Sequence, residues 1–125
     1  MQIVSRRVNT TQGWREIGGN RIFFRSRWEY LYAKDLQWKL EKGLIEKWEH
    51  EPHTFWFEGI KRGCVSYKPD FKVTFLDGTH VWVEVKGYYD AKSLTKIKRM
   101  KKYFPDEKLT LVDSNWFKKN NTKIS

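Results

Sequence analysis

Two acidic residues and a lysine stand in an otherwise apolar and aromatic stretch between positions 67 and 87. Asp70 follows a proline, and Glu84 is followed two positions later by Lys86. Charged side chains among β-branched and aromatic residues cost free energy unless they are paired or bind a cation. Two carboxylates and an ammonium group in such surroundings indicate a functional site.

A turn signal at positions 77–78 predicts a β-hairpin that would bring the two acids together. Apolar and polar residues alternate on both sides of the turn, as in strands with one buried face. A two-residue turn would put the acids on opposite faces. A three-residue loop with its glycine in the left-handed conformation pairs Phe71 with Val83 and sets Asp70 opposite Glu84. We therefore predict a bulged hairpin with both acids on one face.

Carboxylates that face each other across two strands lie roughly 5 Å apart at Cβ. They repel, and one takes up a proton unless a cation lies between them. Carboxylate oxygens are hard ligands that suit Mg²⁺ or Mn²⁺. Lys86 points to the same face as Glu84, where it can hold a water or stabilise charge on a phosphate. The alternative is an exposed polar face on which Lys86 only offsets the acids.

The segments Pro69-Asp70 and Glu84-Val85-Lys86 resemble the signature of the PD-(D/E)XK nuclease superfamily. The wider pattern is similar too, with a helix that carries Glu29 before the hairpin and a basic helix after it. Within the superfamily, residues 21–113 resemble small phage-encoded endonucleases. These include the phage endonuclease I type of Holliday-junction resolvase and the transposon end-cleaving nucleases.

The resemblance implies a metal-dependent endonuclease that hydrolyses DNA phosphodiester bonds. Asp70, Glu84, the carbonyl of Val85 and the carboxylate of Glu29 would hold Mg²⁺, with Mn²⁺ as a substitute. Lys86 would orient the attacking water or stabilise charge. The fold implied is an α/β core in the order helix, three strands, helix, strand, with a mixed sheet flanked by helices. Resolvases of this kind are homodimers that select Holliday junctions or branched DNA by shape, with little sequence specificity.

Composition favours a folded domain with a polyanionic partner. The 125 residues carry a formal net charge of +10, and 17% of them are aromatic, including seven Trp. The charge fits DNA but does not distinguish it from RNA. A non-catalytic DNA-binding module on the same fold is the alternative function. No helix-turn-helix or zinc finger is recognisable, which favours weak sequence specificity.

Cellular location is predicted from what the sequence lacks. No apolar run approaches the ~20 residues that span a bilayer, and no signal peptide opens the chain. Cys64 is the single cysteine, which favours a reducing compartment. We therefore expect an intracellular protein without a membrane partner, in the host cytoplasm if it is phage-encoded.

Basic residues flank the predicted site on both sides. Residues 1–20 are expected to form a basic N-terminal arm or hairpin, and Arg25 and Arg27 follow it as candidate phosphate contacts. A helix from Asp90 or Ser93 to about Phe104 is predicted to contact the DNA backbone. Its basic residues are Lys92, Lys96, Lys98, Arg99, Lys101 and Lys102, and its expected apolar face is Leu94, Ile97, Met100 and Phe104.

Another helix is predicted from Ser26 to about Lys42, before Gly43. Residues 26–29 fit a capping box, in which Glu29 would satisfy the helix's own N-terminus. The resembled nucleases use an acid here to bind metal, so both roles are open.

The remaining segments are less distinctive. Residues 55–57 are predicted to be the first strand of the sheet, and residues 109–112 a buried parallel strand. His50 and His53 are interpreted as polar residues entering a strand, because their spacing is not helical and no third ligand is evident. The nuclease core would span 21–113, followed by a basic tail, 114–125, whose aromatic pair at 116–117 either docks on the domain or contacts DNA or a partner.

Overall fold

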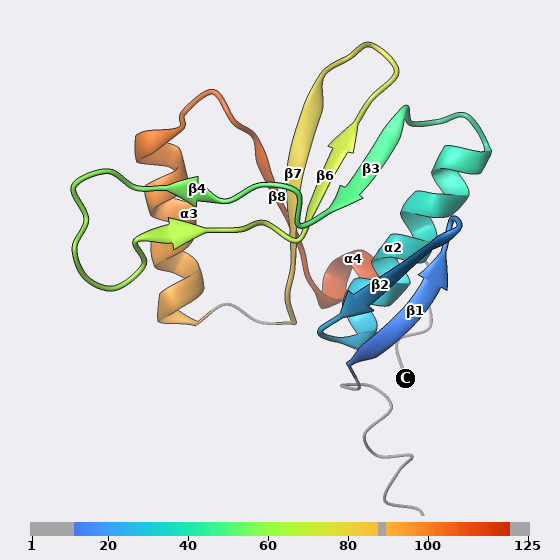
Figure 1. Ribbon diagram of the computed structural model, residues 1–125, viewed down its shortest axis with the longest axis horizontal. Helices are drawn as coiled ribbons and strands as arrows, with labels where there is room; N and C mark the ends of the chain where they lie inside the picture. Colours follow the sequence, from blue (N-terminus) through green and yellow to red (C-terminus); the bar gives the residue numbers. More distant parts are fainter. Residues whose placement is uncertain (1–11, 88–89, 121–125) are drawn as a thin grey trace, which may run out of the picture.

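A four-stranded mixed sheet forms the centre of the computed structural model, which describes residues 12–87 and 90–120 (Figure 1). Its strands lie in the order β3-β6-β7-β8. The first three are mutually antiparallel, and β8 runs parallel to β7. The bounds are β3 Lys47–His50, β6 Phe71–Thr74, β7 His80–Val85 and β8 Leu109–Val112. The α/β class and the mixed sheet are thus confirmed, whereas the finer match to a PD-(D/E)XK core stays a prediction.

Three helices occur in the described ranges: α2 (Arg27–Glu41), α3 (Ala91–Tyr103) and α4 (Ser114–Lys119). The start of α2 is as predicted, because the Ser26 side chain accepts a hydrogen bond from the third residue of the helix. Its end is also as predicted, since Gly43 adopts φ +74 just beyond the C-cap. None of these helices is long and apolar enough to cross a bilayer.

The sheet is covered on both faces. One face packs against α2 and α4, where Phe71 and Val83 join a core with residues of both helices. The other face packs against α3 and a short ribbon of β4 (Phe55–Trp56) and β5 (Ser66–Tyr67), around Trp82 and Met100. Successive residues of a strand point to opposite faces. Val83 therefore enters one core and Trp82 the other, and β7 is the buried middle of the domain.

Three expectations about these elements were wrong. The strand that begins the sheet is β3, and Phe55–Trp56 instead pairs with β5 in the separate ribbon. Strand β8 is parallel but lies at the edge of the sheet, so Leu111 is 39% exposed rather than buried. In α3, Leu94 is 56% exposed and Ser93 is buried, because the helix turns a slightly different side toward Trp82 than its apolar pattern indicated.

A second hairpin, β1 (Gly13–Ile17) and β2 (Asn20–Phe24), packs beside α2 (Figure 1). Its two turn residues, Gly18 and Gly19, both have positive φ, which suits a tight hairpin turn. The hairpin thus covers residues 13–20 of the segment expected to be an arm or hairpin and continues to residue 24, past the expected start of the core at residue 21. Residues 1–11 lie outside the described ranges.

The segment after β8 begins with α4, which docks on the domain. Phe117 is fully buried, with its ring centroid 5.0 Å from that of Trp28. Trp116 contacts Tyr32 at the same centroid distance. Of the two alternatives for this aromatic pair, docking is the one observed, and α4 belongs to the core around α2.

Candidate functional site

The predicted register of the β6–β7 hairpin is confirmed. Phe71 pairs with Val83, and the N–H of Phe75 donates to the carbonyl of Thr79 to close a three-residue loop. Gly78 in this loop has φ +91, the left-handed region that favours glycine. Continued by one position, this register sets Asp70 opposite Glu84.

Asp70 is buried, with 6% of its surface exposed. Its Oδ2 accepts a hydrogen bond from the backbone N–H of Val85 at 2.8 Å. Burial raises the pKa of Asp70 to about 8, assisted by the negative charges of Glu84 and Glu29, whereas the Val85 hydrogen bond acts in the opposite direction. In the metal-free protein near neutral pH, the Asp70 carboxyl therefore keeps its proton to a large extent.

Glu84 is half-buried and receives a hydrogen bond from the hydroxyl of Tyr67, with an O–O distance of 2.6 Å. Burial raises the pKa of Glu84, and the Tyr67 hydrogen bond and the charges of Lys96 and Lys86 counteract this effect. Tyr67 belongs to β5, so the ribbon over the sheet holds the Glu84 carboxylate in place. Sequence reasoning missed Tyr67, because its tie to Glu84 is a contact between distant strands.

Glu29 takes part in the helix cap and also reaches the other acids. Its N–H donates to Oγ of Ser26 at 3.2 Å, while its Oε1 accepts from the N–H of Arg25 at 3.2 Å. Its side chain is nonetheless close enough to raise the pKa of both Asp70 and Glu84. The role of Glu29 at the helix N-terminus is therefore observed, and metal binding by Glu29 stays a prediction.

His50 and Glu51 also lie close to these acids, although neither was among the predicted site residues. Nε2 of His50 is buried without a hydrogen-bond partner and lies 3.7 Å from Oε1 of Glu29. Glu51 has φ +47, the one positive value for a non-glycine residue in the described ranges. Such conformations cost on the order of 1–3 kcal/mol and cluster at functional sites. Glu51 pairs with Arg25 at 3.3 Å and adds to the negative charge around Asp70.

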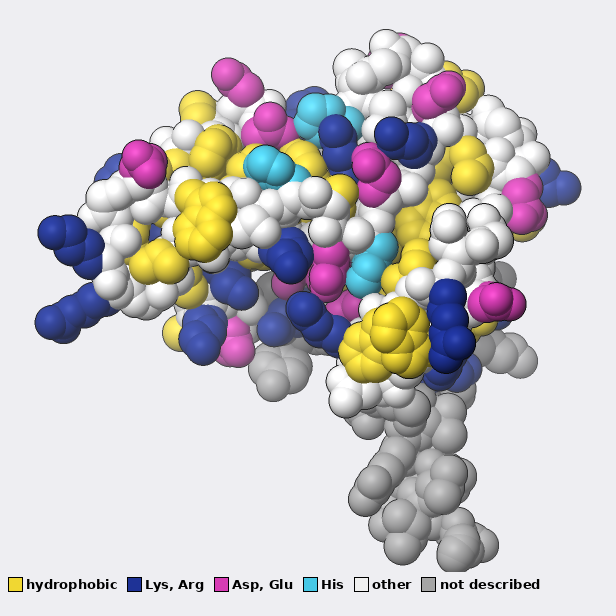
Figure 2. All heavy atoms as spheres, in the orientation of Figure 1, with side chains coloured by type: hydrophobic (Ala, Val, Ile, Leu, Met, Phe, Trp, Pro, Cys, Tyr) yellow, Lys and Arg dark blue, Asp and Glu magenta, His cyan; other side chains and the backbone are white. Residues whose placement is uncertain are grey.

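A cleft of about 370 Å³ is lined by Glu29, Tyr67, Asp70 and Glu84. His50 and Glu51 lie close to its residues Glu29 and Arg25. Figure 2 shows acidic side chains gathered in this central region, with Lys and Arg side chains around them. Of the predicted site residues, the cleft is lined by Glu29, Asp70, Glu84, Val85, Lys86, Arg25 and Lys96.

The other predicted DNA-binding residues do not line the cleft in the described part of the chain. They are Arg27, Lys92, Lys98, Arg99, Lys101 and Lys102. Two of them have local partners: Arg99 donates to the carbonyl of Cys64 before β5, and Lys102 lies over the ring of Tyr103.

The donor set suits a hard cation by its chemistry, although it is not a preformed coordination shell. No group of three or more His, Cys, Asp or Glu side chains in the described ranges is already arranged around a metal position. Two buried carboxylates and one half-buried carboxylate nevertheless repel one another, as the raised pKa of Asp70 and of Glu84 indicates. A divalent cation relieves this repulsion, and oxygen ligands favour Mg²⁺ or Mn²⁺.

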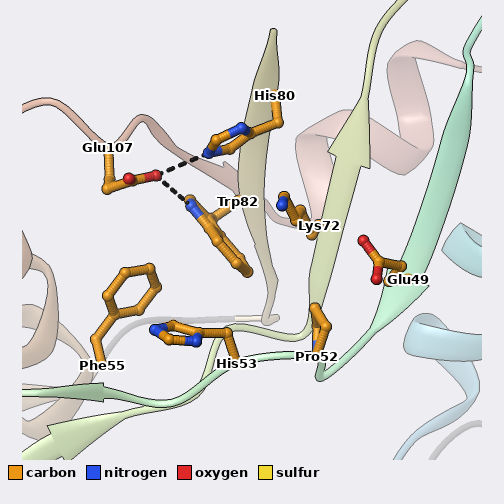
Figure 3. Close-up of a pocket in the computed structure, with 8 residues that line it drawn as sticks. All are labelled: Glu49, Pro52, His53, Phe55, Lys72, His80, Trp82 and Glu107. Atoms are coloured by element: carbon orange, nitrogen blue, oxygen red, sulfur yellow. Dashed lines mark hydrogen bonds and ion pairs between the residues drawn. The ribbon is translucent and has the colours of Figure 1, made fainter. Parts of the chain in front are cut away.

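A second hollow of about 360 Å³ lies on the side of the sheet that carries β4 (Figure 3). Glu107 accepts a hydrogen bond from Nε1 of Trp82 at 2.6 Å and lies 2.9 Å from Nε2 of His80. The hydrogen bonds from His80 and Trp82 lower the pKa of Glu107. His53 packs edge-on against Phe55 in the same hollow, so it lies apart from the carboxylate cleft, whereas His50 lies close to Glu29.

Comparison with known proteins places the whole site within one family. Residues 14–121 match the family described as Protein of unknown function (DUF1064). The chain belongs to this family. The DUF1064 region extends from β1 to α4 and includes every residue of the cleft. No curated protein and no solved structure matches the chain.

Proposed function

We propose that this protein is a metal-dependent endonuclease that hydrolyses DNA phosphodiester bonds. The observation that carries the proposal is the convergence of Glu29, Asp70 and Glu84 in one cleft with Lys86 and Lys96. Folding alone gives no reason to bring three acids together, because their repulsion opposes the folded state. Strongly perturbed carboxylates in a cleft are typical of functional sites.

Asp70, Glu84, the carbonyl of Val85 and Glu29 would hold Mg²⁺, for which Mn²⁺ could substitute. A cation bound there stabilises charge on the phosphate and lowers the pKa of water. The Val85 N–H fixes one oxygen of Asp70, and the Tyr67 hydroxyl fixes one oxygen of Glu84. Lys86, adjacent to Val85 at the end of β7, would orient the attacking water or stabilise the charge that develops on the phosphate.

The charge distribution supports DNA as the substrate. Arg25 and Lys96 enter the cleft from opposite sides, one before α2 and the other from α3. Lys92, Lys98 and Lys101 are exposed on α3, and Arg27, Arg99 and Lys102 extend the basic surface. Contacts of this kind bind the phosphate backbone and position it without reading sequence. We therefore propose structure-selective cleavage of branched DNA, such as a Holliday junction, with little sequence specificity.

Cutting both strands of a branch requires two sites, and the described residues hold one such carboxylate cleft. We therefore propose that the protein acts as a homodimer. Sedimentation or light scattering is expected to give twice the mass of one chain.

The proposal is tested with a labelled four-way junction, a linear duplex and a supercoiled plasmid, each with Mg²⁺ or with EDTA. We expect Mg²⁺-dependent cutting that favours the junction. Asp70→Asn should lower the rate by about 100-fold or more. The matched control is Asp106→Asn, which removes an exposed carboxylate outside the cleft and should leave the rate unchanged.

Two results would contradict the proposal. Full Mg²⁺-dependent cleavage by Asp70→Asn would exclude the assigned site. If no substrate is cut but DNA binds in a salt-sensitive way, the chain is instead a non-catalytic DNA-binding module.

A further inference from the structure

The outer face of the β1–β2 hairpin carries two exposed aromatic rings. Residues at every second position point away from the domain, while Ile17 and Phe24 point toward α2 and are buried. On the outer face, Trp14 is 55% exposed and Phe23 is 37% exposed. A single exposed apolar side chain is common, but Trp14 and Phe23 are in contact and form a continuous apolar patch, which is more often a binding surface.

The rings are held in a fixed arrangement. Trp14 and Phe23 are direct partners in the strand register, with ring centroids 5.5 Å apart at an edge-to-face angle of 66°. The guanidinium of Arg21 lies 5.4 Å from the Trp14 ring. A cross-strand pair and a cation over the ring restrict the indole before any ligand arrives, which reduces the entropy lost on binding.

Arginines continue this face toward the carboxylate cleft. Arg21, Phe23 and Arg25 occupy alternate positions, and Arg25 lines the cleft beside Glu29. Figure 2 shows hydrophobic side chains over the hairpin, flanked by Lys and Arg, next to the acidic centre. A strand of nucleic acid that lies on the hairpin can therefore reach the cleft past Arg21 and Arg25, with the exposed carboxylate of Glu16 opposite Arg21 as the one acid of this face.

We propose that the outer face of the β1–β2 hairpin binds unpaired nucleotides, with a base stacked on Trp14 and phosphates on Arg21 and Arg25. Aromatic rings combined with arginines are the means by which proteins hold single strands, since every base has a face to stack. A paired duplex offers its phosphates but hides its base faces. The inference rests on the proposed function for its second part: among branched substrates, those with unpaired bases beside the cut strand, such as a flap or a fork, are cut faster than a fully paired four-way junction.

Binding is measured in EDTA by fluorescence anisotropy, with a fluorescein-labelled single strand and with the same strand in a duplex. Trp14→Ala should weaken single-strand binding by about tenfold and duplex binding by less than about twofold. Trp14→Phe keeps a ring and should retain most of the affinity. The matched control is Trp38→Ala, which removes an indole that is 52% exposed and lies under Lys42 on α2.

Several outcomes would overturn the inference. Equal losses on single strand and duplex in Trp14→Ala would mean that the hairpin contacts only the backbone. An equal loss in Trp38→Ala would mean that exposed indoles act non-specifically. Trp14-dependent binding to vesicles of phosphatidylglycerol and phosphatidylcholine, without single-strand binding, would assign the face to a membrane surface. Trp14-dependent self-association would assign it to a second copy of the chain.

The same assay separates this inference from the proposed function. Asp70→Asn should bind the single strand as well as the unmodified protein, because Asp70 lies in the cleft and not on the hairpin. If nothing is cut but Trp14→Ala still loses single-strand binding, the hairpin site stands and the nuclease proposal falls. If the protein cuts DNA and Trp14→Ala keeps the same preference for flapped over fully paired substrates as the unmodified protein, the hairpin site is excluded and the nuclease proposal is retained.

Discussion

The backbone N–H of Val85 donates a hydrogen bond to Oδ2 of Asp70 at 2.8 Å. This bond joins the segment before β6 to the last residue of β7. It holds a buried carboxyl group close to Glu84 although the charges of the two groups repel each other. The arrangement is suited to a cation and is unfavourable without one.

The metal-free protein should lose stability as the pH rises from about 4 to about 8. In this window the folded state keeps a proton on Asp70, whose pKa is raised from 3.8 to about 8, while the unfolded chain has released it. The folded state then binds more protons than the unfolded state, so the free energy of unfolding falls with pH. Urea unfolding in EDTA at several pH values measures this slope.

Asp70→Asn should flatten this slope and make the protein more stable than the unmodified chain at pH 8.5, by on the order of 1–3 kcal/mol. The asparagine can still accept the Val85 hydrogen bond. Asp106→Asn serves as the control and should leave the slope unchanged. An unchanged slope in Asp70→Asn would contradict the raised pKa.

Substitutions of Ser26 and Glu29 should distinguish the helix-capping role of Glu29 from its role in cleavage. Ser26→Ala removes the oxygen that accepts from the Glu29 N–H and should lower the free energy of unfolding by about 1 kcal/mol. Glu29→Gln keeps an acceptor for the Arg25 N–H, so stability in EDTA should fall little or rise. Cleavage by Glu29→Gln should nevertheless fall about tenfold or more, because one negative charge is lost from the site. Unimpaired cleavage by Glu29→Gln would leave the residue as a cap alone.

Tyr67→Phe should make Glu84 harder to ionise. The Tyr67 hydroxyl donates to Glu84 and lowers its pKa, so removal of the hydroxyl raises that pKa. The acid side of the pH–rate profile should move to higher pH, and half-maximal cleavage should need about three- to tenfold more Mg²⁺. The loss of stability should be about 1 kcal/mol. Tyr103→Phe, whose ring packs on Phe57 away from the cleft, is the control and should change neither quantity.

Gly87→Ala should strain the end of β7 beside Lys86. A Cβ at position 87 would lie 3.2 Å from Cζ3 of Trp28, and Trp28 is itself packed against Phe117. We expect a loss of about 1–2 kcal/mol in the free energy of unfolding, together with slower cleavage, because Lys86 is displaced. The double variant Gly87→Ala/Trp28→Phe, which has more room, should recover part of the stability. No recovery would mean that the backbone, and not the Trp28 contact, requires glycine.

The parts of the fold that follow from local patterns were predictable. Alternation of apolar and polar residues has a period of two, so a shift of one position would have turned Val83 away from the core. That constraint determined the hairpin loop and set Asp70 opposite Glu84. The bounds of α2 depend on Ser26 and Gly43, which act on their own backbone neighbours. The expectation that Asp70, Glu84 and Lys86 lie together therefore needed only the local hairpin pattern.

Only the tertiary structure decided which residues from distant segments lie beside Asp70, Glu84 and Lys86. Tyr67 reaches Glu84 because the β4–β5 ribbon folds over the sheet. Glu51 lies near Asp70 in a left-handed backbone conformation, which a glutamate in the sequence does not predict. Phe117 is buried because α4 returns to Trp28, although its own segment is polar and basic. These contacts depend on the summed packing of the whole domain. Short patterns specify the elements and their faces, and the approach of one element to another is set by surfaces far apart in the chain.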